Sequence, residues 1–326
     1  MEHRAPELAQ IRADAANLAD AIVQTPMWWW RTDAITASRG PIGLQLKLEL
    51  MQATGSFKAR GALLAARELD ADARARGLVA VSAGNHAIAV SWAARVQGSH
   101  AKVVMPRSAD PWRVQRCREQ GGEVLLVDDV HAAFATAQRI ADDEGRTMIH
   151  PFEGPTVARG TGTIALEILD ALPRLDAIVV PIGGGGLCGG IAAATKQLRP
   201  EVAVYGVEPI GADSMHRSFA AGSPQGIDAV RTIADSLGAP HAAPYSFALC
   251  RRFVDDLVRI DDDMMIRAMA LLYAETKLAV EPAAAAATAA VLGPLAERLA
   301  GREVAVLVCG ANLAPRRFAE LVSPPQ

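Results

Sequence analysis

One lysine of this 326-residue chain lies in an unusual setting for a surface charge. In the stretch ATGSFKARGA, Lys58 follows small residues and Phe57, and a helix-forming run comes after it. A desolvated amine at the positive end of a helix dipole has a lowered pKa. A neutral amine can attack a carbonyl carbon, so the stretch indicates covalent chemistry at Lys58. The simpler alternative is a solvated surface lysine.

A second stretch, VVPIGGGGLCGG, carries four consecutive glycines, Gly183 to Gly186, before a predicted helix. Glycines let the backbone approach an anion, and a helix N-terminus offers free N–H groups. Four glycines exceed what a tight turn needs, so the stretch predicts a phosphate site. Gly184, Gly186 and Gly189 also satisfy GxGxxG, and Glu208 follows about twenty residues later. A nicotinamide (NAD) oxidoreductase is therefore an alternative.

Two further segments could contact a ligand. The segment SAGNHA, from Ser82 to Ala87, lies between a predicted strand and a predicted helix, where its donors suit a carboxylate or a phenolic oxygen. Cys309 lies at the carboxyl end of the last predicted strand, where ligands collect in open α/β sheets. Alone, the first segment could be an ordinary capping loop, and Cys309 could be inert packing.

The composition narrows the function classes. A formal net charge of −3, without a basic run, gives no indication of nucleic-acid binding. No uninterrupted apolar stretch reaches the roughly 18 residues of a membrane span. Four widely spaced cysteines without a CxxC pair fit a reducing, cytoplasmic location and no structural zinc.

Strand-like and helical patterns alternate along most of the chain. Apolar runs such as LQLKLEL, HAKVVMP and DAIVVPI predict strands, and amphipathic or alanine-rich runs between them predict helices. This alternation predicts an α/β fold with doubly wound parallel sheets. Two such groups predict two domains with a cleft between them. The large domain would comprise residues 1–59 and 156–326, and the small domain residues 60–155.

Together the motifs resemble the β-family of pyridoxal-phosphate enzymes, also called fold type II or tryptophan synthase beta-like. More specifically, they resemble the threonine and serine dehydratases and serine racemase. Seven segments match in the family's order and span nearly the whole chain, which favours a catalytic Lys58 over a surface lysine. The segments are TGSFKARGA, SAGNH, GTGTIALEI, GGGGLCGGIA, GVEP, TIAD and CGAN.

The resemblance implies a role for each matching position. Lys58 would hold pyridoxal 5'-phosphate as a Schiff base in the cleft, and the freed amine would remove the α-proton of the substrate. The cofactor would contact Phe57, Lys58, Asn85, Gly183, Gly184, Gly185, Gly186, Leu187, Glu281 and Cys309. The substrate carboxylate would contact Ser82, Ala83, Gly84, Asn85 and His86.

Cys309 bears on the reaction type, because many relatives carry serine there. A thiol is a weak counter-ion, so the pyridine nitrogen is expected to stay unprotonated, which favours loss of a β-substituent. The expected reaction converts a β-hydroxy amino acid, first L-threonine or L-serine, to a 2-keto acid and ammonia. Alternatives are phenylserine or hydroxyaspartate as substrate, racemisation, and a catalytically inactive ligand-binding protein on the same scaffold.

Some positions differ from the family pattern, and these differences help to rank the alternatives. Ala83 stands where serine racemase has a proton-transferring serine, so racemisation ranks below elimination. The relatives' divalent-cation site would use Glu208, but Ser214 replaces the second acid and Asp213 is out of register, so no metal is expected. Arg159 replaces a small residue and could bind an acidic substrate side chain, although pairing with a surface carboxylate is simpler.

Three adjacent tryptophans, Trp28 to Trp30, cannot all face one core. One of them is expected to line a subunit interface. The resemblance also implies a homodimer that acts on a small amino-acid substrate, with no nucleic-acid or membrane partner.

Overall fold

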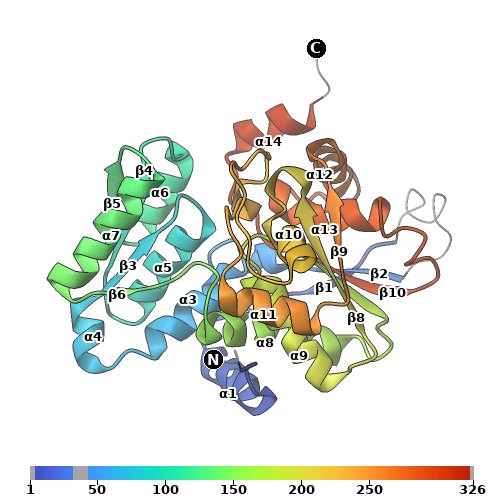
Figure 1. Ribbon diagram of the computed structural model, residues 1–326, viewed down its shortest axis with the longest axis horizontal. Helices are drawn as coiled ribbons and strands as arrows, with labels where there is room; N and C mark the ends of the chain where they lie inside the picture. Colours follow the sequence, from blue (N-terminus) through green and yellow to red (C-terminus); the bar gives the residue numbers. More distant parts are fainter. Residues whose placement is uncertain (1–3, 32–42, 324–326) are drawn as a thin grey trace.

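The computed structural model describes residues 4–31 and 43–323, and its strands form two separate sheets (Figure 1). Within these ranges the larger sheet has six strands, in the order β1-β2-β10-β7-β8-β9. They pair in parallel except β1, which runs antiparallel to β2 at one edge and so departs from the prediction. The strands are β1 (Met27–Trp29), β2 (Gly43–Lys47), β7 (Ala177–Pro181), β8 (Ala203–Pro209), β9 (Asp256–Ile260) and β10 (Glu303–Leu307).

The smaller sheet has four described strands, all parallel, in the order β5-β4-β3-β6. Strand and helix alternate through it, as predicted. Its strands are β3 (Leu78–Val81), β4 (Ala101–Pro106), β5 (Gly122–Val127) and β6 (Thr147–Met148). Its connecting helices are α5 (Asn85–Val96), α6 (Pro111–Glu119) and α7 (Val130–Glu144).

The remaining helices surround the larger sheet or join the two sheets, except α4 (Ala71–Arg76), which lies beside the smaller sheet (Figure 1). They are α1 (Leu8–Leu18), α3 (Lys58–Arg67), α4, α8 (Pro155–Ala171), α9 (Gly186–Leu198), α10 (Ser214–Ala221), α11 (Pro244–Phe253), α12 (Asp262–Thr276), α13 (Pro282–Leu292) and α14 (Pro315–Val322). Short 3₁₀ turns are η1 (Glu49–Met51), η2 (Ile210–Ala212) and η3 (Asp235–Leu237).

The main core lies between the larger sheet and its helices. All five residues of β7 are buried, as expected for a central parallel strand with both faces covered. The alanine run of α13 is also buried and packs against β7 to β10, because small side chains let a helix approach a sheet closely. This run is therefore structural, as the helix propensity of alanine predicts.

The unit around the smaller sheet and the unit around the larger sheet lie side by side, with α3 between them (Figure 1). All strands of the larger sheet fall within the predicted large domain, and all strands of the smaller sheet fall within the predicted small domain. The domain boundaries themselves stay a prediction. Within the described residues, no helix combines the length and the apolar character needed to cross a bilayer.

Candidate active site

A cleft of about 270 Å³ is lined by every residue predicted to contact the cofactor or the substrate carboxylate. Its loops follow the carboxyl ends of parallel strands: residues 82–86 follow β3, residues 183–187 follow β7, and Cys309 follows β10. Glu281 immediately precedes α13, and Lys58 begins α3. The fold therefore brings together segments that are far apart in the sequence, at the sheet edges where α/β proteins bind ligands.

Lys58 is partly buried, and the exposed part of its side chain lines the cleft. Its Nζ donates a hydrogen bond to the carbonyl of Pro151 and lies 5.0 Å from the centre of the Phe57 ring. Burial lowers the pKa of Lys58 to about 8, although Cys309 and Glu281 act in the opposite direction. An appreciable fraction of this amine is therefore neutral near neutral pH, as nucleophilic attack requires.

The four-glycine turn has no room for side chains. A Cβ atom at Gly184 would lie 2.2 Å from ring carbons of Phe152, and one at Gly186 would lie 2.1 Å from the Phe152 carbonyl oxygen. Gly185 has a φ of +94°, which favours glycine. The turn leads into α9, whose first N–H groups have no acceptor within the helix. This arrangement is a cradle for an anion.

The loop of residues 82–86 is held by hydrogen bonds. The Ser82 hydroxyl accepts a hydrogen bond of 3.2 Å from the Gly84 N–H. Burial lowers the pKa of His86 to about 3, so its ring is neutral and donates from Nε2 to the carbonyl of Ile149 at 2.9 Å. Ala83 also lines the cleft, and its methyl side chain cannot transfer a proton.

Two polar side chains that line the cleft, Asn85 and Glu281, form a connected set with Asn312. The Asn85 amide donates to both carboxylate oxygens of Glu281, at 2.7 and 3.0 Å. The Asn312 amide donates to Asn85 Oδ1 at 2.7 Å. Burial raises the pKa of Glu281 to about 6, and it raises the pKa of the Cys309 thiol well above its usual value. Cys309 is therefore a neutral thiol.

The cleft also contains residues to which the sequence alone assigns no role. Pro151 and Phe152 lie between β6 and α8, and the Phe152 ring makes an edge contact with the His150 ring, with centroids 4.7 Å apart. Arg113 and Asp235 line the cleft as an ion pair. Asp235 belongs to the matching segment TIAD, so the family resemblance could have identified it as a site residue. Nothing in the sequence distinguishes Arg113 from the other arginines of its helix.

Arg159 does not line the cleft. Its Nε donates to Asp14 at 2.7 Å, and its Nη2 contacts Glu68. The simpler interpretation, pairing with carboxylates outside the site, is confirmed.

Glu208 also lies outside the cleft, near the carboxyl end of β8. Its carboxylate accepts hydrogen bonds from the N–H groups of Met215 and His216, at 2.8 and 2.7 Å. Asp213 pairs with Arg217 and Arg259. Both acids therefore already have protein partners, and no cluster of three or more metal-ligating acids, histidines or cysteines occurs among the described residues.

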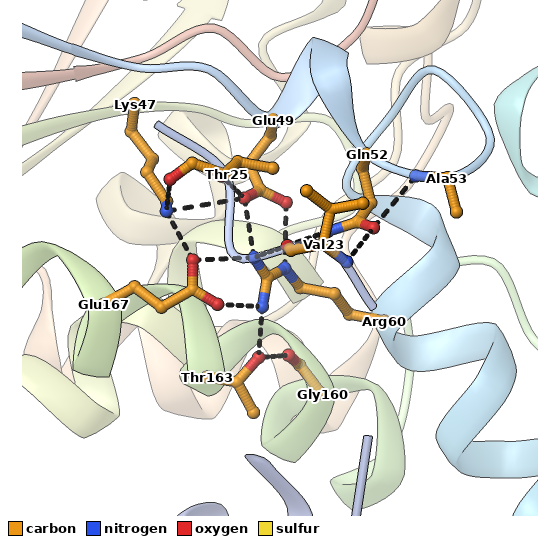
Figure 2. A network of polar contacts seen from close by, with 10 residues as sticks. All are labelled: Val23, Thr25, Lys47, Glu49, Gln52, Ala53, Arg60, Gly160, Thr163 and Glu167. Atoms are coloured by element: carbon orange, nitrogen blue, oxygen red, sulfur yellow. Dashed lines mark hydrogen bonds and ion pairs between the residues drawn. The ribbon is translucent and has the colours of Figure 1, made fainter. Parts of the chain in front are cut away.

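Arg60, two positions after Lys58 on α3, belongs to a buried charge network (Figure 2). Its guanidinium donates to Glu49 at 2.8 and 2.9 Å and to Glu167 at 2.6 and 3.0 Å. Lys47 also contacts Glu167. Residues two apart on a helix do not share a face, so the network anchors α3 from a side different from that of Lys58.

A second cavity of about 660 Å³ lies beside this network, lined mainly by residues of α1 and α8. None of the residues predicted for the cofactor or the substrate lines it. The chemistry predicted from the motifs is therefore confined to the smaller cleft.

The residues of the smaller cleft fit a phosphorylated aldehyde. The turn of Gly183 to Gly186 excludes side chains and presents N–H groups, which suits a phosphate. An amine of lowered pKa suits imine formation with an aldehyde, and it lines the same cleft.

Comparisons with known proteins agree with this fit. The family model described as "Pyridoxal-phosphate dependent enzyme" matches residues 18–310. Phenylserine dehydratase from Ralstonia pickettii is 48% identical over 315 residues, which cover 96% of this chain and 95% of the relative. L-threonine ammonia-lyase from Thermotoga maritima is 38% identical, covering 83% of this chain and 67% of the relative. The structure of maize serine racemase superposes with a TM-score of 0.92 and 33% identity, covering 97% of each chain.

Proposed function

The chain belongs to the pyridoxal-phosphate-dependent enzymes of the threonine deaminase and serine racemase family, and we propose that it is an ammonia-lyase. Its proposed substrate is a β-hydroxy amino acid with an aromatic β-substituent, as in phenylserine. Its cofactor is pyridoxal 5'-phosphate, and its fold is type II. The similarity to phenylserine dehydratase carries the proposal, since it is higher and covers more of both chains than the similarity to L-threonine ammonia-lyase. L-threonine and L-serine, which the sequence alone favours, become the second candidates.

The walls of the cleft support an apolar substrate side chain. Val81, Phe152, Leu237 and Pro240 supply apolar surface there. Arg113 is already paired with Asp235, so it is not free to bind the second carboxylate of hydroxyaspartate. Among the described lining residues, Lys58 is the other cation, and it is committed to the cofactor. An apolar wall of this kind discriminates in favour of a phenyl group.

When bound, the cofactor supplies an electron sink for the charge that develops at the α-carbon of the substrate. The Lys58 amine takes the α-proton, and its lowered pKa keeps part of it neutral and ready for this transfer. The backbone N–H groups at the start of α5 and the Ser82 hydroxyl bind the substrate carboxylate and orient it. Net, the β-hydroxyl leaves as water, and water then hydrolyses the released imine to a 2-keto acid and ammonia.

Two side chains favour elimination over racemisation. A racemase needs a second acid–base group on the opposite face of the substrate, and Ala83 supplies none. Cys309 lines the cleft as a neutral thiol, which would offer the pyridine ring at most a weak hydrogen bond; such weak support would favour loss of a β-substituent.

We also propose that the protein acts on a free amino acid as a homodimer. Trp30 is buried, whereas Trp28 and Trp29 on the edge strand β1 are 45% and 49% exposed. Exposed aromatic residues on a sheet edge suit a protein interface.

The test of the proposed function is keto-acid release from phenylserine, threonine, serine and 3-hydroxyaspartate under the same conditions. We expect kcat/KM for phenylserine to exceed each of the others by roughly tenfold or more, as differences in apolar side-chain burial allow. Higher kcat/KM for threonine or serine would return those amino acids to first place. A cofactor-loaded protein that releases no keto acid from any of the four would be a binding protein.

A further inference from the structure

Arg113 joins the two units of the molecule across the cleft. It lies on α6, beside the smaller sheet, and only 4% of its surface is exposed. Its Nη1 and Nη2 contact the Asp235 carboxylate, with Nη2 to Oδ1 at 3.2 Å, and its Nε donates to the Asn312 carbonyl at 2.9 Å. Asp235 and Asn312 belong to the unit of the larger sheet. One side chain therefore contacts two segments on the opposite side of the cleft.

The contact continues inward as a chain of hydrogen bonds. Asn312 Nδ2 donates to the Thr54 carbonyl at 2.8 Å and to Asn85 Oδ1 at 2.7 Å. Asn85 in turn donates to Glu281 at 2.7 and 3.0 Å. Because Asn85 accepts on one side and donates on the other, its amide has a single orientation.

We propose that Arg113 is a positioning residue, which holds the two units together over the cleft and, through Asn312 and Asn85, fixes the placement of Glu281. The proposal rests on the proposed cofactor site but on no particular substrate. Arginine suits this role because its planar fork reaches a carboxylate and a carbonyl at once, whereas a lysine ammonium lacks that geometry. The Arg113 guanidinium is buried, so the pair is not one of the weak pairs between two exposed side chains.

Electrostatics give the proposal a directional test. Burial raises the pKa of Glu281 to about 6, Arg113 acts to lower it, and Asp235 acts to raise it. The other groups that face Glu281 are Lys58, Cys309, Asn85 and Ser236. Removal of the Arg113 cation should therefore raise the pKa of Glu281, and removal of the Asp235 anion should lower it.

The experiment titrates the cofactor absorption band of the holoenzyme with pH, without substrate, in Arg113→Met, Arg113→Lys and Asp235→Asn. Arg107→Met is the matched control, because Arg107 pairs with Asp128 within the unit of the smaller sheet. We expect the midpoint near pH 6 to rise in Arg113→Met, to fall in Asp235→Asn, and to stay unchanged in Arg113→Lys and in the control. Each shift should be about half a pH unit or more.

Hydrogen exchange on the same proteins tests the mechanical part. Arg113→Met and Arg113→Lys should both speed exchange in α6 and in residues 82–86 by roughly tenfold, since each loses the Nε contact with Asn312. Midpoints that move in the same direction in Arg113→Met and Asp235→Asn, or unchanged exchange in both Arg113 variants, would overturn the proposal. If Arg113→Met does not fold, a midpoint that rises in Asp235→Asn, or unchanged exchange in Arg113→Lys, would overturn the proposal. An absence of phenylserine turnover would overturn the proposed substrate alone, because neither measurement uses substrate.

Discussion

Lys47 and Lys58 are two lysines in the protein interior with different surroundings. Lys47, at the end of β2, is 0% exposed, and its Nζ contacts Glu167, the Thr25 carbonyl at 2.7 Å and Glu49 at 4.0 Å. Lys58 contacts a backbone carbonyl and opens onto the cleft. Burial lowers the pKa of both amines.

The two lysines differ in whether their amines can be reached from the cleft and in whether carboxylates pair with them. Two carboxylates flank the Lys47 ammonium in the buried network (Figure 2), and none of the Lys47 surface is exposed to solvent. Lys58 has a carbonyl as its hydrogen-bond acceptor, and a phosphate cradle lines the same cleft. A buried lysine therefore becomes a candidate catalyst when its charge is poorly compensated and its nitrogen is reachable.

Lys58→Ala should have the largest effect on activity. We expect kcat for keto-acid release to fall by about a thousandfold or more, because the variant loses both the attachment of the cofactor and the proton acceptor. The variant should also lack the absorption band that borohydride shifts in the parent protein. Full activity in Lys58→Ala would contradict the proposed mechanism.

Lys47→Met should show the opposite pattern. It leaves Glu167 and Glu49 less compensated in the interior, and breaking a buried ion pair costs about 3–5 kcal/mol of unfolding free energy. Lys102→Met is the matched control, because its partner Glu144 is more exposed and such a pair contributes about 1 kcal/mol or less. Urea unfolding measures both, and the activity of the remaining folded Lys47→Met should stay near that of the parent. Equal losses of unfolding free energy in Lys47→Met and Lys102→Met would contradict a special structural role for the buried Lys47 ammonium.

The pH dependence of cofactor attachment sharpens the comparison further. Because the pKa of Lys58 is about 8, the neutral fraction of its amine rises roughly tenfold between pH 7 and pH 9 and then levels off. The rate at which the apoprotein forms the imine band should follow this curve. A rate that keeps rising tenfold per pH unit up to pH 10 would indicate an ordinary lysine pKa.

Much of the fold could be predicted because alternation of strands and helices is a local property of the sequence. The buried strands of both sheets read as continuous apolar runs, for example AIVVP in β7. The antiparallel pairing of β1 with β2 could not be predicted in this way. Strand direction depends on the path of the chain between the strands and on tertiary contacts, and no local pattern encodes it.

The site could be predicted where the backbone itself imposes a residue type. The turn of Gly183 to Gly186 accepts no side chains, so the sequence marks it. Arg113 and Asp235 could not be paired from the sequence, because they are 122 positions apart and meet only when the two units face each other. Contacts of this kind depend on the relative placement of the units, which motifs do not record.

The tryptophans of β1 should give the smallest effect on activity. Trp28→Ser with Trp29→Ser should weaken the proposed homodimer, since both side chains are about half exposed and lie on an edge strand. Because neither lines the cleft, we expect kcat to change by less than about threefold at protein concentrations where the variant still self-associates. Sedimentation velocity measures the assembly state, and Trp30→Phe, a change in the core, is the control that should leave it unaltered. A doubly substituted protein that sediments as the parent does would place the interface on another face, and it would leave the assignment of Lys58 intact, since Lys58 and β1 lie on different elements.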